Sequence, residues 1–242
     1  MKDDMSGQWS KTAFELITGG FSGKSIVFEL TALVDEVLSG AFRTATIHDA
    51  PDALSLVAIG GYGRSEIVPY SDIDIMLLSK GRDKKTTESA QAVFYKLWDM
   101  GLDISHCFRT LDECVVDAVS DLKTRTAIID SRYLAGSKTL YNEFLRDIYP
   151  KILFKKKQDF VGSLLGEVKM RHKTYEDSVY LLEPNVKDGI GGLRDIHMLT
   201  WLSKVVLKIN DISGLAALLP KNDYLHLMKS FDFLLRVRLS LH

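Results

Sequence analysis

Two short apolar runs separated by a glycine-rich turn constrain the fold of this chain more than any other feature. The runs ALSLVAIG (residues 53–60) and DIDIMLLS (residues 72–79) are bounded by glycine, proline or serine, which favours strands over helices. Between them, GGYGRSEIVPYSDID (residues 60–74) opens with a cluster of glycines. We therefore predict that the two runs form the centre of a sheet and are joined by a turn that exposes its backbone.

The surrounding sequence places helices next to this sheet. Apolar residues recur at helical spacing over residues 25–44 and 86–101, whereas residues 102–110 alternate as a third strand does. The tetrapeptide TLDE that follows is typical of a capping box at the start of a helix. From that point the strand signals stop. The predicted fold class is therefore α+β, with a small sheet followed by an all-helical region.

The helical region is interrupted once. Helices are predicted over residues 110–119, 122–135, 137–148, 151–177, 193–209 and 222–242. Residues 179–195 carry Pro184 and several glycines and are expected to form a loop. The last helix keeps its apolar spacing to the final residue without a stop signal, so we expect the helical domain to be truncated. The predicted domains are an N-terminal helical segment (1–48), a core with the sheet (49–140) and a helical domain (141–242).

Charge and composition exclude several classes of partner. With a formal net charge of -1, the chain has no global field that would attract nucleic acid or an anionic membrane. The sequence has no signal peptide and no apolar stretch of roughly 18 residues that would span a membrane. We therefore expect a cytoplasmic protein that binds neither nucleic acid nor membranes. Cys107 and Cys114 are not spaced for zinc and are interpreted as buried thiols.

Two aspartates at the end of the glycine-rich turn form a candidate metal site. Side chains of a strand alternate between faces, so Asp72 and Asp74 project to one side while Ile73 and Ile75 turn into the core. Their carboxylates then lie within about 7 Å of each other. Like charges at this separation repel each other unless a cation is present. Oxygen ligands of this kind suit Mg²⁺, which shares its coordination shell with substrate phosphates.

The glycine turn supplies the complementary half of such a site. Gly60, Gly61 and Gly63 remove side-chain bulk, so backbone amide groups can approach phosphate oxygens, and Arg64 adds further donors. Two metals about 3.5–4 Å apart would then stabilise an in-line phosphoryl displacement. Two alternatives stay open: a dinucleotide-binding fingerprint, although its third glycine is missing, and a hairpin turn whose aspartates face water.

Three blocks of the sequence, in order, resemble a known family. Residues 60–78, 97–136 and 181–204 are similar to successive blocks of the bacterial PII uridylyltransferase family. The glycine pair and the later Asp-Ile-Asp also resemble the signature of the polymerase-beta-like nucleotidyltransferase superfamily. The resemblance extends over residues 25–242. It implies a polymerase-beta-like nucleotidyltransferase core with a small mixed sheet over residues 49–140, followed by the helical domain.

This resemblance implies roles for individual residues. Asp72 and Asp74 would be catalytic ligands of Mg²⁺. The superfamily usually adds a third carboxylate from a later strand, for which Asp103 is the candidate, as catalytic residue and metal ligand; the position of Ser105 is the alternative. The implied nucleotide-binding residues near the turn are Gly60, Gly61, Gly63, Arg64 and Ser71.

The third block contains a second glycine loop, residues 189–192. Its GGLRD sequence is predicted to open a helix, and the N-terminus of a helix attracts anions. Lys187 and Arg194 are therefore candidates for binding the phosphates or the base of the nucleotide. The alternative is a structural loop in which Arg194 pairs with Asp195 or Glu183.

The implied activity is the transfer of UMP from UTP to a tyrosine of the PII signal protein, with release of pyrophosphate. UTP and PII are the expected partners, and Mg²⁺ is the expected cofactor. Nothing local in the sequence distinguishes uracil from adenine, so an adenylyltransferase, or another nucleotidyltransferase with a different acceptor, is one alternative. A catalytically weak PII-binding module is another. The family's domains for uridylyl removal and glutamine sensing have no residues here, so neither property is expected.

Overall fold

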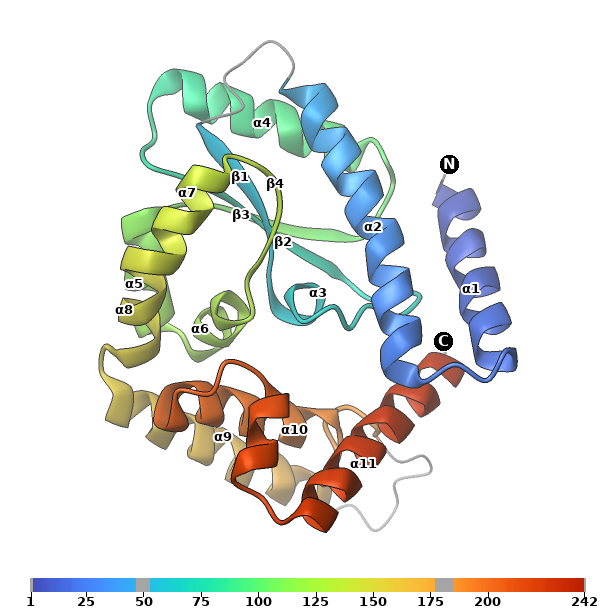
Figure 1. Ribbon diagram of the computed structural model, residues 1–242. Coiled ribbons are helices and arrows are strands. Elements are labelled where there is room, and N and C mark those ends of the chain that lie inside the picture. The colour runs from blue at the N-terminus through green and yellow to red at the C-terminus, as the bar shows by residue number, and fades with distance from the viewer. Residues whose placement is uncertain (1, 47–52, 177–184, 242) are drawn as a thin grey trace. The chain divides into compact units, whose positions relative to one another are not determined.

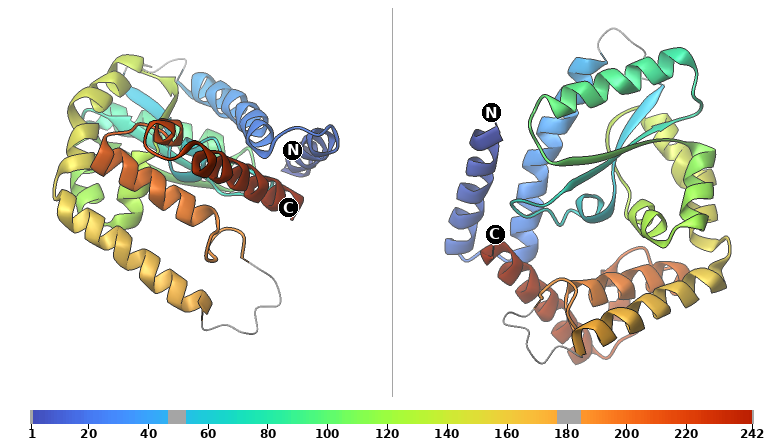
Figure 2. Two further views of the ribbon diagram at one scale, coloured as in Figure 1. Left: turned by 60° about the horizontal axis from the view of Figure 1, so that its bottom comes forward. Right: turned by 180° about the vertical axis from the view of Figure 1, so that it is seen from behind.

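The chain folds into two compact units. The computed structural model describes residues 2–46, 53–176 and 185–241. The first unit, called the sheet unit here, comprises Met1–Phe21 and Ser25–Ile152, and the second, the helical unit, comprises Ser22–Lys24 and Leu153–His242. All the strands of the described residues belong to the sheet unit, as the views in Figures 1 and 2 show.

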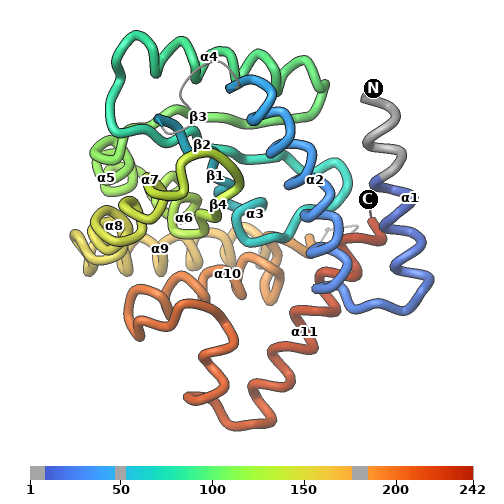
Figure 3. Tube along the Cα trace, turned by 45° about the horizontal axis from the view of Figure 1, so that its top comes forward, coloured from blue at the N-terminus to red at the C-terminus, as the bar shows by residue number. Residues whose placement is uncertain are grey.

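A mixed four-stranded sheet forms the centre of the sheet unit, with the strand order β3-β2-β1-β4. The strands are β1 (Leu54–Ala58), β2 (Ile73–Ser79), β3 (Ile104–Thr110) and β4 (Arg132–Gly136). Strand β1 is antiparallel to β2 and β4, whereas β2 and β3 are parallel, and Figure 3 follows the chain through them. The predicted α+β fold with a small mixed sheet is confirmed, and β1 and β2 occupy the centre as predicted.

Strand β4 contradicts the prediction of one helix over residues 122–135. Helix α6 (Leu122–Ile129) ends six residues before the predicted boundary, and after Asp130 the chain pairs with β1. The strand is short and its partner is distant in sequence, so no local alternation marked it. Its conformation is decided by pairing with β1, because strand preference depends strongly on tertiary context.

One face of the sheet packs on a core shared with three helices. These are α1 (Lys2–Thr18), α2 (Gly23–Ala45) and α4 (Lys84–Trp98). Ile73 and Ile75 of β2 are buried in this core. The helices predicted from apolar spacing at α2 and α4 are confirmed. Ile73, Ile75 and Leu77 alternate along β2 and all belong to this core, so the residues between them point to the other face of the sheet.

The opposite face carries helices α5 (Leu111–Ser120), α6 and α7 (Lys138–Glu143). The capping box predicted at the start of α5 is present. The thiol of Cys114 in α5 lies 3.8 Å from the sulfur of Met76 in β2. Residues of β2 that point away from the first core therefore meet a second layer of helices, and this is the face on which Asp74 lies.

The predicted helix over residues 151–177 is two helices. The chain passes from α7 through a π-helical turn (Phe144–Ile148) into α8 (Tyr149–Phe154), and α9 (Lys157–Glu176) follows. Lys156 lies between them with a φ of +48°, which a helix cannot accommodate. The break therefore results from a local backbone reversal that side-chain periodicity does not reveal.

The helical unit is built from α9, α10 (Leu193–Leu202), a π-helical turn (Ser203–Leu207), a 3-10 turn (Ile212–Ala217) and α11 (Lys221–Ser240). Helix α10 packs against both α9 and α11. The start of the predicted loop, before residue 185, lies outside the described residues. Among the helices that the structure describes, none is long and apolar enough to cross a membrane.

Candidate active site

The glycine turn after β1 is a single helical turn, α3 (Gly60–Gly63). The amide of Ile59 donates a hydrogen bond of 3.0 Å to the carbonyl oxygen of Asp74, which ties the turn to β2. Gly60 has a φ of +58°, and a Cβ at this position would lie 3.1 Å from Oδ2 of Asp74. Glycine therefore allows the Asp74 carboxylate to lie against the turn, whose opening amide groups have no partner within the turn.

The other two glycines of the turn differ in what surrounds them. A Cβ on Gly63 would lie 1.9 Å from the carbonyl oxygen of Asp130, so no side chain fits there. A Cβ on Gly61 would meet only Nη2 of Arg64, at an ordinary 3.7 Å. Packing thus explains glycine at position 63 but not at position 61. Nucleotide binding by the three glycines stays a prediction.

Asp74 lies on the face of β2 that strand parity predicts, whereas a shared face with Asp72 stays a prediction. Asp72 is exposed just before β2, and Asp74 is half-buried within it. Ile73 and Ile75, which alternate with them, are 1% and 0% exposed. The Asp74 carboxylate therefore faces away from the core, beside the glycine turn, and Asp72 is exposed to solvent. Such oxygen donors fit a hard divalent cation that keeps part of its water and binds phosphate.

The neighbouring strand places a hydroxyl rather than a carboxylate beside Asp74. In the parallel pairing of β2 and β3, Asp74 is opposite Ser105, and Asp103 precedes the strand. The carbonyl oxygen of Asp103 accepts the amide of Ile73 at 2.9 Å, while its side chain is exposed. Within the described ranges, no three His, Cys, Asp or Glu side chains are grouped to hold a metal. A catalytic role for Asp103 stays a prediction.

Arg64 is held by carboxylates of its own unit. Its Nε lies 3.0 Å from Oε2 of Glu66, and its Nη1 lies 2.7 Å from Oδ2 of Asp130. Burial alone would lower the pKa of Arg64, but these two charges raise it. Ser71 accepts the amide of Val68 at 3.3 Å within a local turn. For both Arg64 and Ser71, nucleotide binding remains a prediction.

A second set of contacts anchors the turn from the other side. Tyr62 is fully buried, and its hydroxyl donates to Oδ1 of Asp35 at 2.7 Å. Arg132 donates to both oxygens of Asp35, at 2.6 and 3.0 Å, and to the carbonyl of Tyr62 at 3.3 Å. These residues carry no signal in the sequence, because Asp35 and Arg132 are 97 positions apart and no local pattern joins them.

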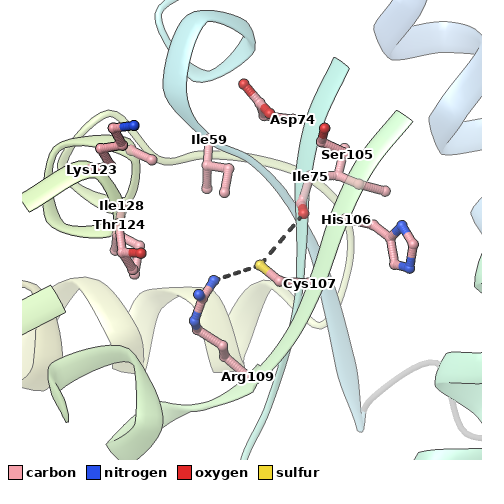
Figure 4. Close-up of a pocket in the computed structure, with 11 residues that line it drawn as sticks. Ile59, Asp74, Ile75, Ser105, His106, Cys107, Arg109, Lys123, Thr124 and Ile128 are labelled. Carbon is pink, nitrogen blue, oxygen red and sulfur yellow. Dashed lines mark hydrogen bonds between the residues drawn. The ribbon is translucent and has the colours of Figure 1, made fainter. Parts of the chain in front are cut away.

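A cavity of about 280 Å³ lies beside Asp74, between β3 and α6 (Figure 4). Ser105 and Cys107 line it from β3, and Lys123 and Thr124 line it from α6. In Figure 4 the ring of His106 points away from the cavity. Strand parity could have identified Ser105 and Cys107 as neighbours of Asp74. The α6 residues became visible only with the fold.

The two cysteines differ in burial, and the prediction for one of them was wrong. Cys114 is buried, and burial raises the pKa of its thiol to about 12. Cys107 is only half-buried and lines the cavity, with Nη1 of Arg109 2.6 Å from its sulfur. Burial also raises the pKa of Cys107, although the charge of Arg109 opposes this. Its position on the edge strand β3 explains the exposure.

The second glycine loop, in the helical unit, is stabilised by its own polar groups. The side-chain oxygen of Asn185 accepts the amides of Lys187 and Asp188 at 3.0 and 2.8 Å. Gly191 has a φ of +74°, and Gly192 is the N-cap of α10. The predicted tight path and helix start are confirmed here. Lys187 is exposed at the surface of this loop.

Arg194 pairs with a different acid from those expected. Its Nε lies 3.3 Å from Oδ1 of Asp188. Asp195 instead binds Arg171, His172 at 3.1 Å and the amide of Gly191 at 2.8 Å. Pairing of Arg194 with Asp195 is therefore wrong, because the Asp195 carboxylate binds Arg171, His172 and the amide of Gly191. Glu183 lies outside the described residues. Nucleotide binding by Lys187 and Arg194 stays a prediction.

Comparison with known proteins gives consistent matches over most of the chain. Residues 159–242 match the family model described as GlnD PII-uridylyltransferase. Relatives named bifunctional uridylyltransferase/uridylyl-removing enzyme include one from Bradyrhizobium sp. (strain ORS 278), 37% identical over 230 residues, which cover 91% of this chain and 25% of the relative. The enzyme of the same name from Novosphingobium aromaticivorans is 36% identical over 220 residues, 90% of this chain and 24% of the relative.

A third relative of that name, from Azospirillum brasilense, is 35% identical over 232 residues. That alignment covers 91% of this chain and 25% of the relative. The chain therefore spans about a quarter of the length of these relatives. The family model lies in the helical unit, and the alignments with the relatives cover 90–91% of the chain. By these similarities the chain belongs to the PII-uridylyltransferase family.

Proposed function

We propose that this chain is a nucleotidyltransferase module that transfers UMP from UTP to a tyrosine of the PII protein. The observation that carries the proposal is the Asp74 carboxylate lying against the glycine turn, with the exposed Asp72 two residues before it in the chain. Family membership supports uridylyl as the group and PII as the acceptor. The residues of 49–140 form the proposed catalytic core, flanked by the helical segment 1–48 and the helical domain 141–242.

In the proposed step, the phenolic oxygen of the tyrosine attacks the α-phosphorus of UTP. The new O–P bond forms as the bond to the β-phosphate oxygen breaks, so pyrophosphate leaves with that electron pair. The phenolic proton passes to a carboxylate of the site, Asp74 or Asp103. The opening amide groups of α3 have no hydrogen-bond acceptor within the turn, so they can donate to phosphate oxygens of UTP. Bound Mg²⁺ would supply charge stabilisation of the attacking and leaving oxygens.

The proposed aspartate pair can be tested directly. We expect Asp72→Asn and Asp74→Asn to lower the transfer of labelled UMP from UTP to PII by at least about 100-fold, the scale of losing one preorganised electrostatic group. Asp99→Asn is the matched control, because Asp99 is an exposed residue at the end of α4. Thermal melting of each variant checks the fold. If both site variants transfer UMP as fast as the wild type, Asp72 and Asp74 are not the ligands of a catalytic metal.

The helical-unit candidates need a separate measurement. If Lys187 and Arg194 bind the nucleotide, Lys187→Met should raise the KM for UTP while kcat stays unchanged, because an interaction made equally in the ground and transition states contributes only to binding. Lys229→Met, an exposed lysine on α11, serves as the control. If the KM for UTP is unchanged in Lys187→Met, Lys187 does not bind the nucleotide and is only part of the loop structure.

A further inference from the structure

The cavity beside Asp74 is the part of the sheet unit whose role is not explained by the glycine turn or the aspartate pair. It is lined on the carboxylate face of the sheet by Asp74, Ser105, Cys107, Arg109, Lys123 and Thr124. We call it the β3 cavity. It extends from Ser105 and Cys107 of β3 past Asp74 and Ile59 to α6, as Figure 4 shows. Its contact with Asp74 makes it part of the same site.

The order of the strands determines which substrate the β3 cavity serves. Strand β2, which carries Asp74, has β1 and the glycine turn on one side and β3 on the other. An in-line displacement requires the attacking and leaving oxygens to lie on opposite sides of the phosphorus. If the glycine turn holds the leaving pyrophosphate, the attacking hydroxyl arrives from the β3 side. Ser105 and Cys107 line the cavity on that side, and Ile59, next to the glycine turn, lines its opposite edge.

The size and polarity of the cavity fit one aromatic side chain. Pockets for drug-sized ligands are about 300–1,000 Å³, and the β3 cavity, at about 280 Å³, falls just below this range. Ile59, Ala127 and Ile128 give it apolar walls, while Asp74 and Ser105 make one end polar. A phenol has the same two parts, an apolar ring and a polar tip.

Two cations line the cavity, and they differ in how they are held. Arg109 is bound to Asp117 at 2.8 Å and to the sulfur of Cys107, so its position is fixed. Lys123 lies in the first turn of α6 and is exposed. A phenol of pKa about 10 is protonated at neutral pH, and a nearby ammonium favours its anion. Lys123 is thus suited to the reacting oxygen of an acceptor.

Building on the proposed function, we propose that the β3 cavity binds the acceptor tyrosine, with its ring between β3 and α6. Its hydroxyl points to Asp74, and Lys123 stabilises the negative charge that develops on the phenolic oxygen as its proton leaves. Ala127 and Ile128 contact the ring. The cavity therefore determines both the affinity for the acceptor and the rate of its attack, and it leaves the affinity for UTP unaffected.

Two variants of α6 test this assignment. Ala127→Phe fills the cavity, and Lys123→Met removes its exposed charge while keeping most of the side-chain length. We expect each to lower kcat/KM for PII by about tenfold or more, with the equilibrium affinity for UTP unchanged. Lys123→Arg should retain more activity than Lys123→Met. Lys96→Met, an exposed lysine on α4, is the control and should match the wild type.

The outcomes separate this inference from the proposed function. If the wild type transfers no UMP to PII, the proposed function fails and the cavity assignment fails with it. If the wild type is active and both α6 variants match Lys96→Met, the cavity assignment alone is wrong. If the α6 variants bind UTP more weakly while their KM for PII is unchanged, the cavity is a nucleotide subsite, and the assignment to the acceptor tyrosine is wrong. Circular dichroism checks folding, and the exposed Lys123 keeps the test usable if Ala127→Phe does not fold.

Discussion

At the scale of single residues, the structure separates groups that shape the site from groups that remain candidates for chemistry. Arg64 was predicted from sequence as a phosphate donor, yet two of its nitrogens bind Glu66 and Asp130. Asp130 is 66 positions away in the sequence. The spacing of residues 60–74 placed Arg64 at the turn, but it could not predict the contact with Asp130. The contacts of Arg64 indicate that it holds the turn in place.

Loss of the Arg64 contacts should therefore destabilise the sheet unit. In Arg64→Met, the side chains of Glu66 and Asp130 stay buried without their cation, and breaking a buried ion pair costs about 3–5 kcal/mol. Urea unfolding measures this free energy. Arg146→Met is the matched control, because its pair with Asp147 is exposed and water screens it strongly. Equal stability of the two variants, with a raised KM for UTP in Arg64→Met, would instead favour nucleotide binding.

Asp195 gives the helical unit a predicted dependence on pH. Partial burial alone would raise the pKa of Asp195, but hydrogen bonds from Arg171, Gly191 and His172 hold it below its ordinary value of 3.8. A carboxylate with a lowered pKa stabilises the folded state above the unfolded pKa, and this contribution is lost as pH falls through the folded pKa. We expect Asp195→Asn to lower the free energy of unfolding at pH 7 and to reduce its loss below about pH 4.

Urea unfolding at a series of pH values from neutral to acidic measures this effect. Asp99→Asn, at an exposed position of the sheet unit, should keep the acid dependence of the wild type. An acid dependence that is the same in Asp195→Asn and in the wild type would contradict the assignment.

At the scale of elements, the sequence predicts what periodicity and capping determine. Strands β1 to β3 and helices α2, α4 and α5 were located from their apolar patterns, and the capping box of α5 from four residues. Strand β4 and the break at Lys156 were missed. The first depends on a distant partner strand and the second on a backbone angle, and neither leaves a periodic signal.

The tight contact behind the glycine turn gives a prediction about that element. Gly63→Ala places a Cβ 1.9 Å from the Asp130 carbonyl, so we expect a loss of about 1–3 kcal/mol or more in unfolding free energy. Gly40→Ala is the matched control in the same unit. Gly40 lies inside α2 with open space at its Cβ, so alanine there should stabilise by about 0.5–1 kcal/mol. A Gly63→Ala variant as stable as the wild type would contradict the packing described for α3.

At the scale of the whole molecule, the candidate site was only partly predictable. The aspartate pair and the glycine turn followed from strand parity and from glycine spacing within fifteen residues, 60–74. The β3 cavity combines β2, β3 and α6 and needed the fold. Uridylyl transfer to PII rests on family membership, and the chain spans about a quarter of its relatives. No residue of the site distinguishes uracil from adenine by position alone.

The central claim is that Asp72 and Asp74 direct uridylyl transfer to a tyrosine of PII. Mass spectrometry of intact PII, after incubation with this chain, Mg²⁺ and an equal mixture of UTP and ATP, tests it most directly. We expect PII to gain the mass of one uridylyl group per subunit on a tyrosine, and we expect Asp74→Asn to leave PII unmodified. Addition of an adenylyl group, or unmodified PII with the wild-type chain, would contradict it.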